Sequence, residues 1–316
     1  MAKPVLKWAG GKRQLLDEIY ARFPEEYGHF HEPFFGGGAV FFDLEPGDGT
    51  INDTNPRLVN FYEIVRDRPD ELIERLEEFR DPSSEPNPEE DFATENWKGK
   101  SIDEYFYQQR ALFNRRPYAD ETWPETSEDK LEEAALLLYL NRTCYNGLYR
   151  ENSNGGFNVP IGRYENPDWV RESEIRAAST ALKNTEIRND DFEYIGEVVS
   201  QGDLVYFDPP YEPMSQTANF AEYSAEGFER EDQERLLGIC KELQENGVFF
   251  VLSNSAVMFD LYDEVEGFTV ENEGATRSIN SDETSRGEVN EIIATNVPVD
   301  NQRRTIQQAS IGDFEP

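Results

Sequence analysis

Residues 203–213, "DLVYFDPPYEP", join an apolar run to an acid, two prolines and an aromatic ring. Ligands of α/β proteins bind beyond the carboxyl ends of strands, so this pattern places Asp208 to Tyr211 at a ligand-binding edge. The prolines stiffen the turn and lack a backbone N–H, which leaves nearby carbonyls available. Asp208 and the carbonyl of Pro209 can then accept hydrogen bonds from one planar NH₂ group, while Tyr211 stacks on the ring that carries it. The alternative is a proline-rich turn that only closes a strand.

A second segment, residues 32–42 ("EPFFGGGAVFF"), places three glycines between a strand-like run and a helix. Glycine permits a ligand to approach the backbone closely, and the N-terminus of the following helix offers free N–H groups. Asp53 ends the next strand, where a carboxylate can accept hydrogen bonds from a ribose diol. Such a turn can also be purely structural. The chain contains neither G-x-G-x-x-G here nor G-x-x-x-x-G-K-[ST] elsewhere, so a phosphate cradle is disfavoured.

The elements that must position these residues alternate between strands and helices. Further strands are expected in residues 185–192, 248–255 and 290–296, with a helix in residues 228–247. Residues 57–170 instead show apolar residues at helical spacing, interrupted by a Pro- and acid-rich stretch at 81–98. We therefore predict an α/β fold with a mostly parallel sheet covered on both faces. Residues 1–56 and 171–316 would form this part, and residues 57–170 would form an inserted helical domain.

The composition is that of a strongly acidic globular protein. The 316 residues have a formal net charge of −35, yet 13% are aromatic, which argues against a disordered acidic chain. Such composition resembles proteins of salt-loving microbes, since self-repulsion is tolerable where salt shortens the Debye length to about 3 Å. No apolar run is long enough to span a membrane, and only two cysteines are present, far apart in the sequence. We expect a soluble, cytoplasmic protein without a disulfide framework.

Six stretches together resemble the Dam-type DNA adenine-N6 methyltransferases, alpha group and D12 class. They run from Leu6 to Asn296 in the order "LKWAGGKRQLL", "EPFFGGGAVFF", "NDTNPRLVNFY", "YLNRTCYNGLYRENSNGGFNVPIGRY", "DPPYEPMSQTANFAEY" and "RSIN" with "RGEVNEIIATN". The resemblance implies a Rossmann-like S-adenosylmethionine-dependent methyltransferase sheet with an inserted helical target-recognition domain. It also implies S-adenosylmethionine as the cofactor, double-stranded DNA as the substrate and GATC as the recognition site.

The resemblance further implies roles for individual residues. Asp208, Pro209 and Tyr211 would hold the target adenine. Cofactor contacts would come from Trp8, Lys12, Phe35, Gly36, Gly38, Asp53, Phe192 and Asp208. The residues that would read and grip DNA, several of them in a predicted hairpin near 141–164, are Lys7, Arg142, Tyr145, Asn146, Leu148, Arg150, Pro160 and Arg163.

The implied reaction has a simple physical basis. The exocyclic N6 of adenine is a poor nucleophile because its lone pair is conjugated into the ring. Hydrogen bonds to Asp208 and Pro209 would shift this lone pair toward sp³ and toward a sulfonium methyl, for one-step in-line transfer. The base must be flipped out of the duplex to be reached. Stacking on Tyr211 would return about 1–3 kcal/mol of the unstacking cost.

The distribution of acids indicates where so acidic a chain could bind a polyanion. Residues 1–16, 134–150 and 152–164 contain no Asp or Glu. Buried segments such as "VFFVLSNSAVMF" are acid-free as well, but the Asn-, Gly- and Arg-rich stretch around 141–164 is typical of a hairpin or loop. Arg150 and Arg163 are of the residue type that binds guanine N7 and O6. In molar salt, counterion release contributes little, so affinity would depend more on base contacts.

Alternatives and departures from the family pattern stay open. "SNSAV" replaces the usual His-containing segment, so no role passes to Ser255. His29 and His31 are expected at the surface or in loops, and no motif calls for a metal. A monomer is expected. The other functions considered are an RNA adenine-N6 methyltransferase and an inactive DNA-binding relative; the long insert between Asp53 and Asp208 favours duplex DNA, and the intact "DPPY" favours activity.

Overall fold

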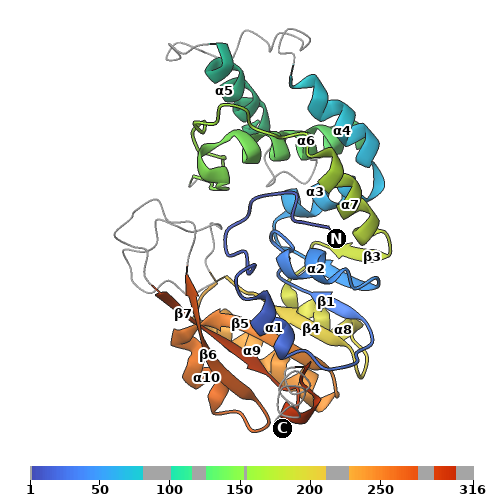
Figure 1. Ribbon diagram of the computed structural model, residues 1–316, viewed down its shortest axis with the longest axis vertical. Coiled ribbons are helices and arrows are strands. Elements are labelled where there is room, and N and C mark those ends of the chain that lie inside the picture. Colours follow the sequence, from blue (N-terminus) through green and yellow to red (C-terminus); the bar gives the residue numbers. More distant parts are fainter. Residues whose placement is uncertain are drawn as a thin grey trace, which may run out of the picture.

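The computed structural model describes residues 2–80, 101–115, 126–152, 155–210, 228–276 and 288–303. A seven-stranded sheet in the order β3-β2-β1-β4-β5-β7-β6 forms its centre (Figure 1). The strands are β1 Phe30–Glu32, β2 Gly49–Asn52, β3 Thr185–Arg188, β4 Leu204–Phe207, β5 Phe249–Ser255, β6 Thr269–Thr276 and β7 Glu288–Thr295. The first five strands pair in parallel, and β7 lies antiparallel between β5 and β6. The expected α/β class is confirmed, with a mixed, Rossmann-like sheet.

Helices cover both faces of this sheet and form a separate layer above its β3 edge (Figure 1). The α-helices are α1 Leu16–Ala21, α2 Ala39–Leu44, α3 Pro56–Asp67, α4 Pro69–Glu78, α5 Ser101–Asn114, α6 Ser127–Thr143, α7 Glu172–Leu182, α8 Ile195–Val198, α9 Arg230–Glu245 and α10 Phe259–Asp263. Short 3₁₀ turns include η2 Tyr145–Gly147 and η3 Phe192–Tyr194. Strand β6 was not expected from the sequence, because Glu271 and Glu273 interrupt its few apolar residues.

Strand β4 shows why the sheet is covered on both sides. Consecutive side chains of a strand point to opposite faces. Leu204 and Tyr206 belong to one buried apolar cluster, together with residues of α1, whereas Val205 and Phe207 belong to a second cluster that includes residues of α8, α9 and α10. All four side chains are buried. A continuous apolar run is therefore required here, as in the interior strands of parallel sheets.

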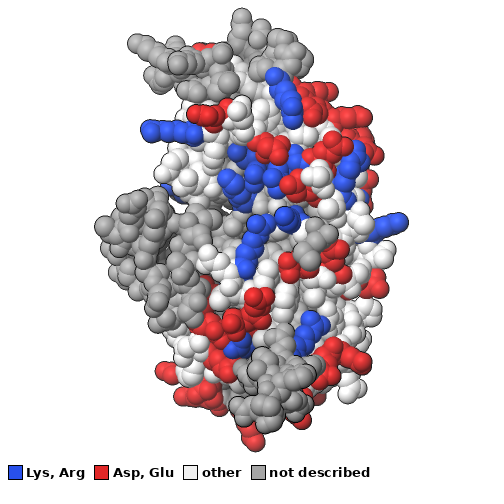
Figure 2. Space-filling view, in the orientation of Figure 1, with Lys and Arg blue, Asp and Glu red and all other residues white. Residues whose placement is uncertain are grey.

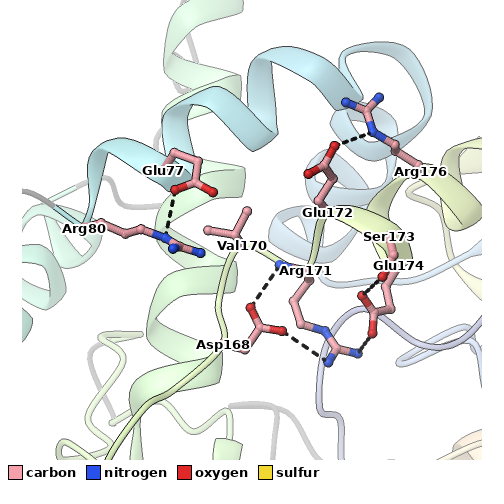
Figure 3. A pocket seen from close by; sticks show the side chains of 9 residues that line it. All are labelled: Glu77, Arg80, Asp168, Val170, Arg171, Glu172, Ser173, Glu174 and Arg176. Carbon is pink, nitrogen blue, oxygen red and sulfur yellow. Dashed lines mark hydrogen bonds and ion pairs between the residues drawn. The ribbon is translucent and has the colours of Figure 1, made fainter.

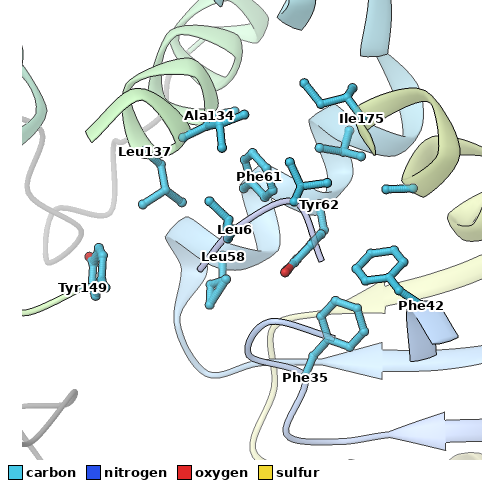
Figure 4. Close-up of a cluster of buried hydrophobic side chains, with 14 of the residues drawn as sticks. Leu6, Phe35, Phe42, Leu58, Phe61, Tyr62, Ala134, Leu137, Tyr149 and Ile175 are labelled. Carbon is cyan, nitrogen blue, oxygen red and sulfur yellow. The ribbon is translucent and has the colours of Figure 1, made fainter. Parts of the chain in front are cut away.

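Helix α3 connects the sheet to the helical layer. It follows β2 directly, with Asn55 capping its N-terminus and Pro56 at its first position, and it contacts β3, α6 and α7. The helical pattern expected through residue 79 is divided at Arg68, because Pro69 begins a new helix, α4. Figure 4 shows side chains from the sheet and the helical layer meeting around α3, including Leu6, Phe35, Phe42, Leu58, Phe61, Tyr62, Ala134, Leu137, Tyr149 and Ile175.

One expectation about the histidines is wrong. His31 lies within β1 and is only 3% exposed, because the strand that carries it is interior. Its Nδ1 lies 2.9 Å from the Thr50 hydroxyl and its Nε2 lies 3.4 Å from Asp203. Burial lowers the pKa of His31, although the Asp203 carboxylate opposes this effect. His29, in contrast, has a largely exposed side chain, as expected.

Several bulk expectations concern absences, and they apply only to the described ranges. No helix there is long and apolar enough to cross a membrane. Within the same ranges, no group of three or more His, Cys, Asp or Glu residues is arranged to hold a metal ion. Cys144 and Cys240 are both buried and form no disulfide. The acidic stretch 81–98 lies outside the described residues.

We predict that Gly49→Ala lowers the free energy of unfolding by about 3 kcal/mol or more. Gly49 has φ of 147°, and an added Cβ would lie 1.7 Å from the carbonyl oxygen of Phe30, between two paired strands. Urea denaturation in molar KCl measures the effect. Gly238→Ala in α9 is the control: no atom lies within 4 Å of its added Cβ, so stability should rise by about 0.5–1 kcal/mol. Equal stability of the two variants would contradict the prediction.

Candidate active site

The two segments singled out in the sequence meet at the point where the strand order reverses. From β1 the chain proceeds outward to β2 and β3, and then returns to β4 on the other side of β1. Parallel strands end at the same edge, and this reversal point is where open α/β sheets bind ligands. Asp53 follows the end of β2 and Asp208 follows the end of β4, and these two strands flank β1. At about 4.8 Å per strand, the backbones of β2 and β4 are about 10 Å apart.

The glycine loop after β1 is held by three hydrogen bonds. The Gly36 N–H donates to Asp53 Oδ2 at 2.9 Å, the Tyr62 hydroxyl donates to the Gly36 carbonyl at 2.9 Å, and the Gly38 N–H donates to the Phe35 carbonyl at 2.7 Å. Gly36 and Gly38 have φ of 48° and 65°, and a Cβ at Gly38 would lie 2.5 Å from the Phe35 ring. These positions therefore require glycine for the loop to adopt its shape at all.

The carboxylate of Asp53, at the end of β2, accepts two hydrogen bonds. Its Oδ1 accepts a hydrogen bond from the Asn55 N–H at 2.8 Å, in addition to the bond from Gly36. Burial raises the pKa of Asp53, and the two N–H donors oppose the shift. Each carboxylate oxygen has a second lone pair, so the group can accept further hydrogen bonds from a diol while it braces the loop.

The aromatic residues among the predicted cofactor contacts differ in how far their rings are buried. Trp8 covers the glycine loop, since a Cβ at Gly36 would lie 3.0 Å from its ring. Phe35 is 3% exposed, and its ring packs edge-on against Tyr62 at 4.7 Å and against Gly38, so the ring supports the loop from the buried side. Phe192 is equally buried, with its ring 5.3 Å from the half-buried Phe34. Phe34 was not selected from the sequence, although it directly follows "EP".

A buried ionic group lies beyond the end of β4 and beside β7. Lys12 Nζ lies 2.7 Å from Asp208 Oδ1, 3.1 Å from the Gly10 carbonyl, to which it donates, and 4.0 Å from Glu291 Oε2. Burial raises the pKa of Asp208 to about 6, even though Lys12 acts to lower it. Burial alone would lower the pKa of Lys12, but the carboxylates of Asp208 and Glu291 reverse that direction. The Lys12 ammonium therefore lies next to Asp208, with Glu291 farther from it.

A third carboxyl group, that of Glu32 at the end of β1, is in a different environment. It is 2% exposed and accepts a hydrogen bond from the Phe41 N–H at 3.1 Å. Burial, with the nearby charge of Asp208, raises its pKa well above the usual value. Burial therefore favours the neutral form of Glu32 more than that of an exposed carboxyl group. Pro209, predicted to offer its carbonyl, directly follows Asp208 and is buried, whereas Tyr211 lies outside the described residues.

The predicted hairpin is present in the described residues around 141–164. Antiparallel bridges join Cys144 to Ile161 and Glu151 to Phe157. Tyr149 and Phe157 are buried against the helical layer, so the alternate side chains face outward. None of the eight residues predicted to contact DNA is buried; they are Lys7, Arg142, Tyr145, Asn146, Leu148, Arg150, Pro160 and Arg163.

The N-terminal segment connects this hairpin to the glycine loop. The Asn141 side chain accepts a hydrogen bond from the Lys7 N–H and donates one to the Lys7 carbonyl, both at 2.8 Å. Gly147 has φ of 69° and approaches Lys7 so closely that an added Cβ would lie 2.3 Å from Lys7 Cδ. The next residue, Trp8, stacks on Tyr149 with ring centroids 4.9 Å apart. The same two-residue stretch thus touches both predicted sites.

Positive charge gathers near this junction. Burial lowers the pKa of Lys7, and the neighbouring Arg142 and Arg171 lower it further. Figure 2 shows Lys and Arg side chains grouped on the visible face between the helical layer and the sheet, with Asp and Glu towards both ends. Arg171 was not selected from the sequence, because its neighbours along the chain are acidic. A cationic region of this kind fits a polyanion in an otherwise acidic protein.

A hollow between the end of α4 and the start of α7 is not part of this site. It has a volume of about 510 Å³ and is lined by Glu77, Arg80, Asp168, Val170, Arg171, Glu172, Ser173, Glu174 and Arg176 (Figure 3). Its three arginines are paired with carboxylates: Arg80 with Glu77, Arg171 with Glu174, and Arg176 with Glu172. The hollow shares no residue with the glycine loop or the 208–211 segment. The charged side chains that line it are accounted for by the ion pairs among them.

Comparison with known proteins defines the family. The fold and the edge motifs are those of a Rossmann-like methyltransferase, and residues 8–279 match the family model of the D12 class N6 adenine-specific DNA methyltransferases. The chain belongs to this family. It is 40% identical over 298 residues to the type II methyltransferase M1.LlaDCHI of Lactococcus lactis, covering 93% of this chain and 95% of that protein.

Two further relatives cover nearly the same span. The type II methyltransferase M.MjaIII of Methanocaldococcus jannaschii is 38% identical over 288 residues, which is 88% of this chain and 93% of that protein. The DNA adenine methylase of Escherichia coli K12 is 33% identical over 295 residues, which is 93% of this chain and 95% of that protein. The resemblance to Dam-type enzymes is thereby confirmed, and the chain is an adenine-specific DNA methyltransferase.

We predict that Tyr149→Ala reduces kcat/KM for methyl transfer at least about tenfold and lowers the free energy of unfolding by about 3–5 kcal/mol. The reason is that Tyr149 is 1% exposed and supports Trp8 over the glycine loop. The matched control is Tyr149→Phe, which keeps the stacked ring and removes only the hydroxyl that donates to Glu151. It should retain most of the activity. An alanine variant as active and stable as the phenylalanine variant would contradict a supporting role.

Proposed function

We propose that this enzyme transfers a methyl group from S-adenosylmethionine to N6 of an adenine flipped out of duplex DNA, within GATC. The observation that carries the proposal is the meeting of two features at the β1–β4 reversal. A glycine loop braced by Asp53 lies on one side, and Asp208 lies about two strands away on the other. A nucleoside-type cofactor and a planar amino group could therefore be held side by side at one edge.

The residues around the glycine loop fit the proposed cofactor. Asp53 has acceptor capacity left for the ribose hydroxyls, and the loop from Gly36 to Gly38 brings backbone close to the methionine part. Trp8 covers the loop, while Phe34 with Phe192 offers an aromatic wall for the adenine. The negative balance of Asp208 and Glu291 over Lys12 suits a cationic sulfonium. When bound, the cofactor supplies the electrophilic methyl group.

Asp208 is the residue we expect to touch the reacting amino group. Its carboxylate and the Pro209 carbonyl would accept the two N6 hydrogens and direct the nitrogen lone pair at the methyl group. A buried carboxylate is a stronger acceptor than one in water, because no solvent competes for its lone pairs. Its pKa of about 6 keeps it ionised at neutral pH. Tyr211 is proposed to stack on the flipped base.

We propose that residues 57–170 act as the target-recognition domain on a catalytic part formed by 1–56 and 171–316. The predicted boundary falls in the first turn of α3, and the apolar core continues across it, so the two parts would move little relative to each other. Arg150 and Arg163, both exposed, are the proposed readers of guanine, and Lys7 lies beside Tyr164 at the base of the hairpin. A monomer acting on cytoplasmic DNA is the simplest arrangement.

The charge of −35 leads us to propose a high-salt working environment. Concentrated salt screens repulsion within the acidic surface, and it also weakens phosphate contacts through loss of counterion release. Sequence selection would then depend on the hairpin's contacts with bases more than on long-range attraction. Assays therefore belong in molar KCl.

We predict that labelled methyl groups are transferred to duplex DNA that contains GATC and not to a duplex in which GATC is changed to GTTC. The measurement is incorporation from labelled S-adenosylmethionine in molar KCl, with an RNA of the same sequence in parallel. Label on RNA alone would support the RNA methyltransferase, and binding without transfer would support an inactive relative. Equal incorporation into both duplexes would remove the GATC assignment while leaving DNA methylation intact.

We predict that Asp208→Asn reduces transfer by at least about 10³-fold, since an amide offers one acceptor and places an N–H against the N6 amino group. For the unmodified enzyme, kcat/KM should fall about tenfold per pH unit below pH 6, because Asp208, with a pKa of about 6, is protonated there and loses acceptor capacity. Asp260→Asn, on the exposed side of α10, is the matched control. A flat profile down to pH 5 would contradict the role of an ionised Asp208.

A further inference from the structure

Glu291 is a buried carboxylate beside the proposed site that none of the sequence motifs brings into the chemistry. It lies in β7, is 5% exposed, and its Oε2 has no hydrogen-bond partner among the described residues. Its nearest cation is Lys12, whose Nζ lies 4.0 Å from that oxygen. Burying a carboxylate oxygen that accepts no hydrogen bond is costly, so such groups are rare unless they have a purpose.

The register explains how Glu291 reaches Asp208. Glu291 pairs with Ser255 of β5, and Ser253 pairs with Ile293 of β7. Extending the β4–β5 register by one residue aligns Asp208 with Ser253. Side chains two residues apart lie on the same face, so Asp208 and Glu291 share the face that the N-terminal segment covers. Tyr206, also on this face, bonds Ser253 at 3.1 Å and adds no charge at neutral pH.

Among the described residues, the other acids near Glu291 are accounted for. Glu273 lies directly opposite Glu291 in β6 and is paired with Arg22, which also binds Glu271 at 2.7 Å. Glu32 accepts a hydrogen bond from the Phe41 N–H, and burial raises its pKa. Lys12 is therefore the ammonium that Asp208 and Glu291 share, and it lies much closer to Asp208, at 2.7 Å against 4.0 Å.

This unequal sharing conflicts with the proposed role of Asp208. A carboxylate that already accepts a charge-assisted hydrogen bond from Lys12 is a poorer acceptor for a neutral amino group. Moving the ammonium away without a second carboxylate would leave a buried charge unpaired, which is strongly unfavourable. A shift of about 1 Å toward Glu291 would instead bring Lys12 within hydrogen-bond distance of that carboxylate.

We propose that Glu291 is a positioning residue that receives the Lys12 ammonium when the target adenine donates its amino group to Asp208. This inference rests on the proposed function. No bond other than hydrogen bonds changes in this step, and no proton is transferred. The ammonium remains charged throughout, paired first mainly with Asp208 and then with Glu291, so the buried site keeps the same total charge before and after the base enters.

The test compares Glu291→Gln and Glu291→Asp with the unmodified enzyme. In Glu291→Gln, Lys12 has no second carboxylate and stays on Asp208, so kcat/KM for duplex DNA should fall about 10–100-fold. Affinity for S-adenosylhomocysteine, which is uncharged at sulfur, should change less than about threefold in calorimetric titration. Glu291→Asp keeps the charge and should restore at least part of the activity.

The pH profile separates this role from simple structural support. The charge of Glu291 contributes to the raised pKa of Asp208, so its removal should shift the acidic limb of kcat/KM to lower pH in Glu291→Gln. Glu273→Gln, at the opposite position in β6, is the matched control and should leave the limb in place. Should Glu291→Gln fail to fold, judged by its circular dichroism and urea transition, the rate and pH limb of Glu291→Asp decide the question.

The outcomes distinguish this inference from the function on which it rests. Wild-type kcat/KM with an unshifted acidic limb in Glu291→Gln, or a Glu291→Asp variant as impaired as Glu291→Gln, would overturn the role of Glu291 while leaving DNA methylation untouched. Failure of the unmodified enzyme to methylate any duplex would instead count against the proposed function itself.

Discussion

The parallel pairing of β1 with β4 is the contact on which the site depends. Two strands about 170 residues apart in the chain lie side by side, with Phe30 opposite Leu204. Because they run in the same direction, the glycine loop and Asp208 emerge at one edge. Antiparallel pairing would have placed them at opposite ends of the sheet. The His29 N–H, just before β1, donates a hydrogen bond at 2.8 Å to Asp203, just before β4, and this contact supports the register.

The N-terminal segment, residues 7–12, also holds the site together, because its residues contact parts of the protein that are distant in the chain. Lys7 is held by Asn141 at the end of α6, Trp8 lies between the glycine loop and Tyr149, and Lys12 lies near the carboxylates of Asp208 after β4 and Glu291 in β7. The hairpin, the glycine loop and the proposed catalytic carboxylate are thus connected through a stretch of six residues. A ligand that displaces this stretch at one of the three places would therefore also change the geometry at the other two.

Periodicity and turn chemistry made much of this fold predictable. Apolar runs ending in Asp53 and Asp208 marked strands, and helical spacing marked the region from α3 to α6. The errors have identifiable causes. Pro69 divides one predicted helix into two, β6 was missed because charged residues interrupt its apolar pattern, and His31 was assigned to the surface although its strand is interior. Histidine is a polar residue type, which favours a surface position in a sequence-based prediction. In the structure, however, the Thr50 and Asp203 side chains satisfy both ring nitrogens of His31.

The sequence by itself determined the family, the acids that end strands and the glycines that the loop needs. It also determined the absence of Asp and Glu from most of the hairpin. All of these features depend on local geometry and residue type. Only the tertiary structure decided which charges share a site. Glu291 reaches Lys12 through the pairing of β7 with β5, Asn141 and Tyr149 reach the N-terminal segment across the core, and Arg171 lies beside Lys7 and Arg142. Most of these contacts join residues more than a hundred positions apart, and electrostatic effects depend on distance and burial in space, which no spacing along the chain records.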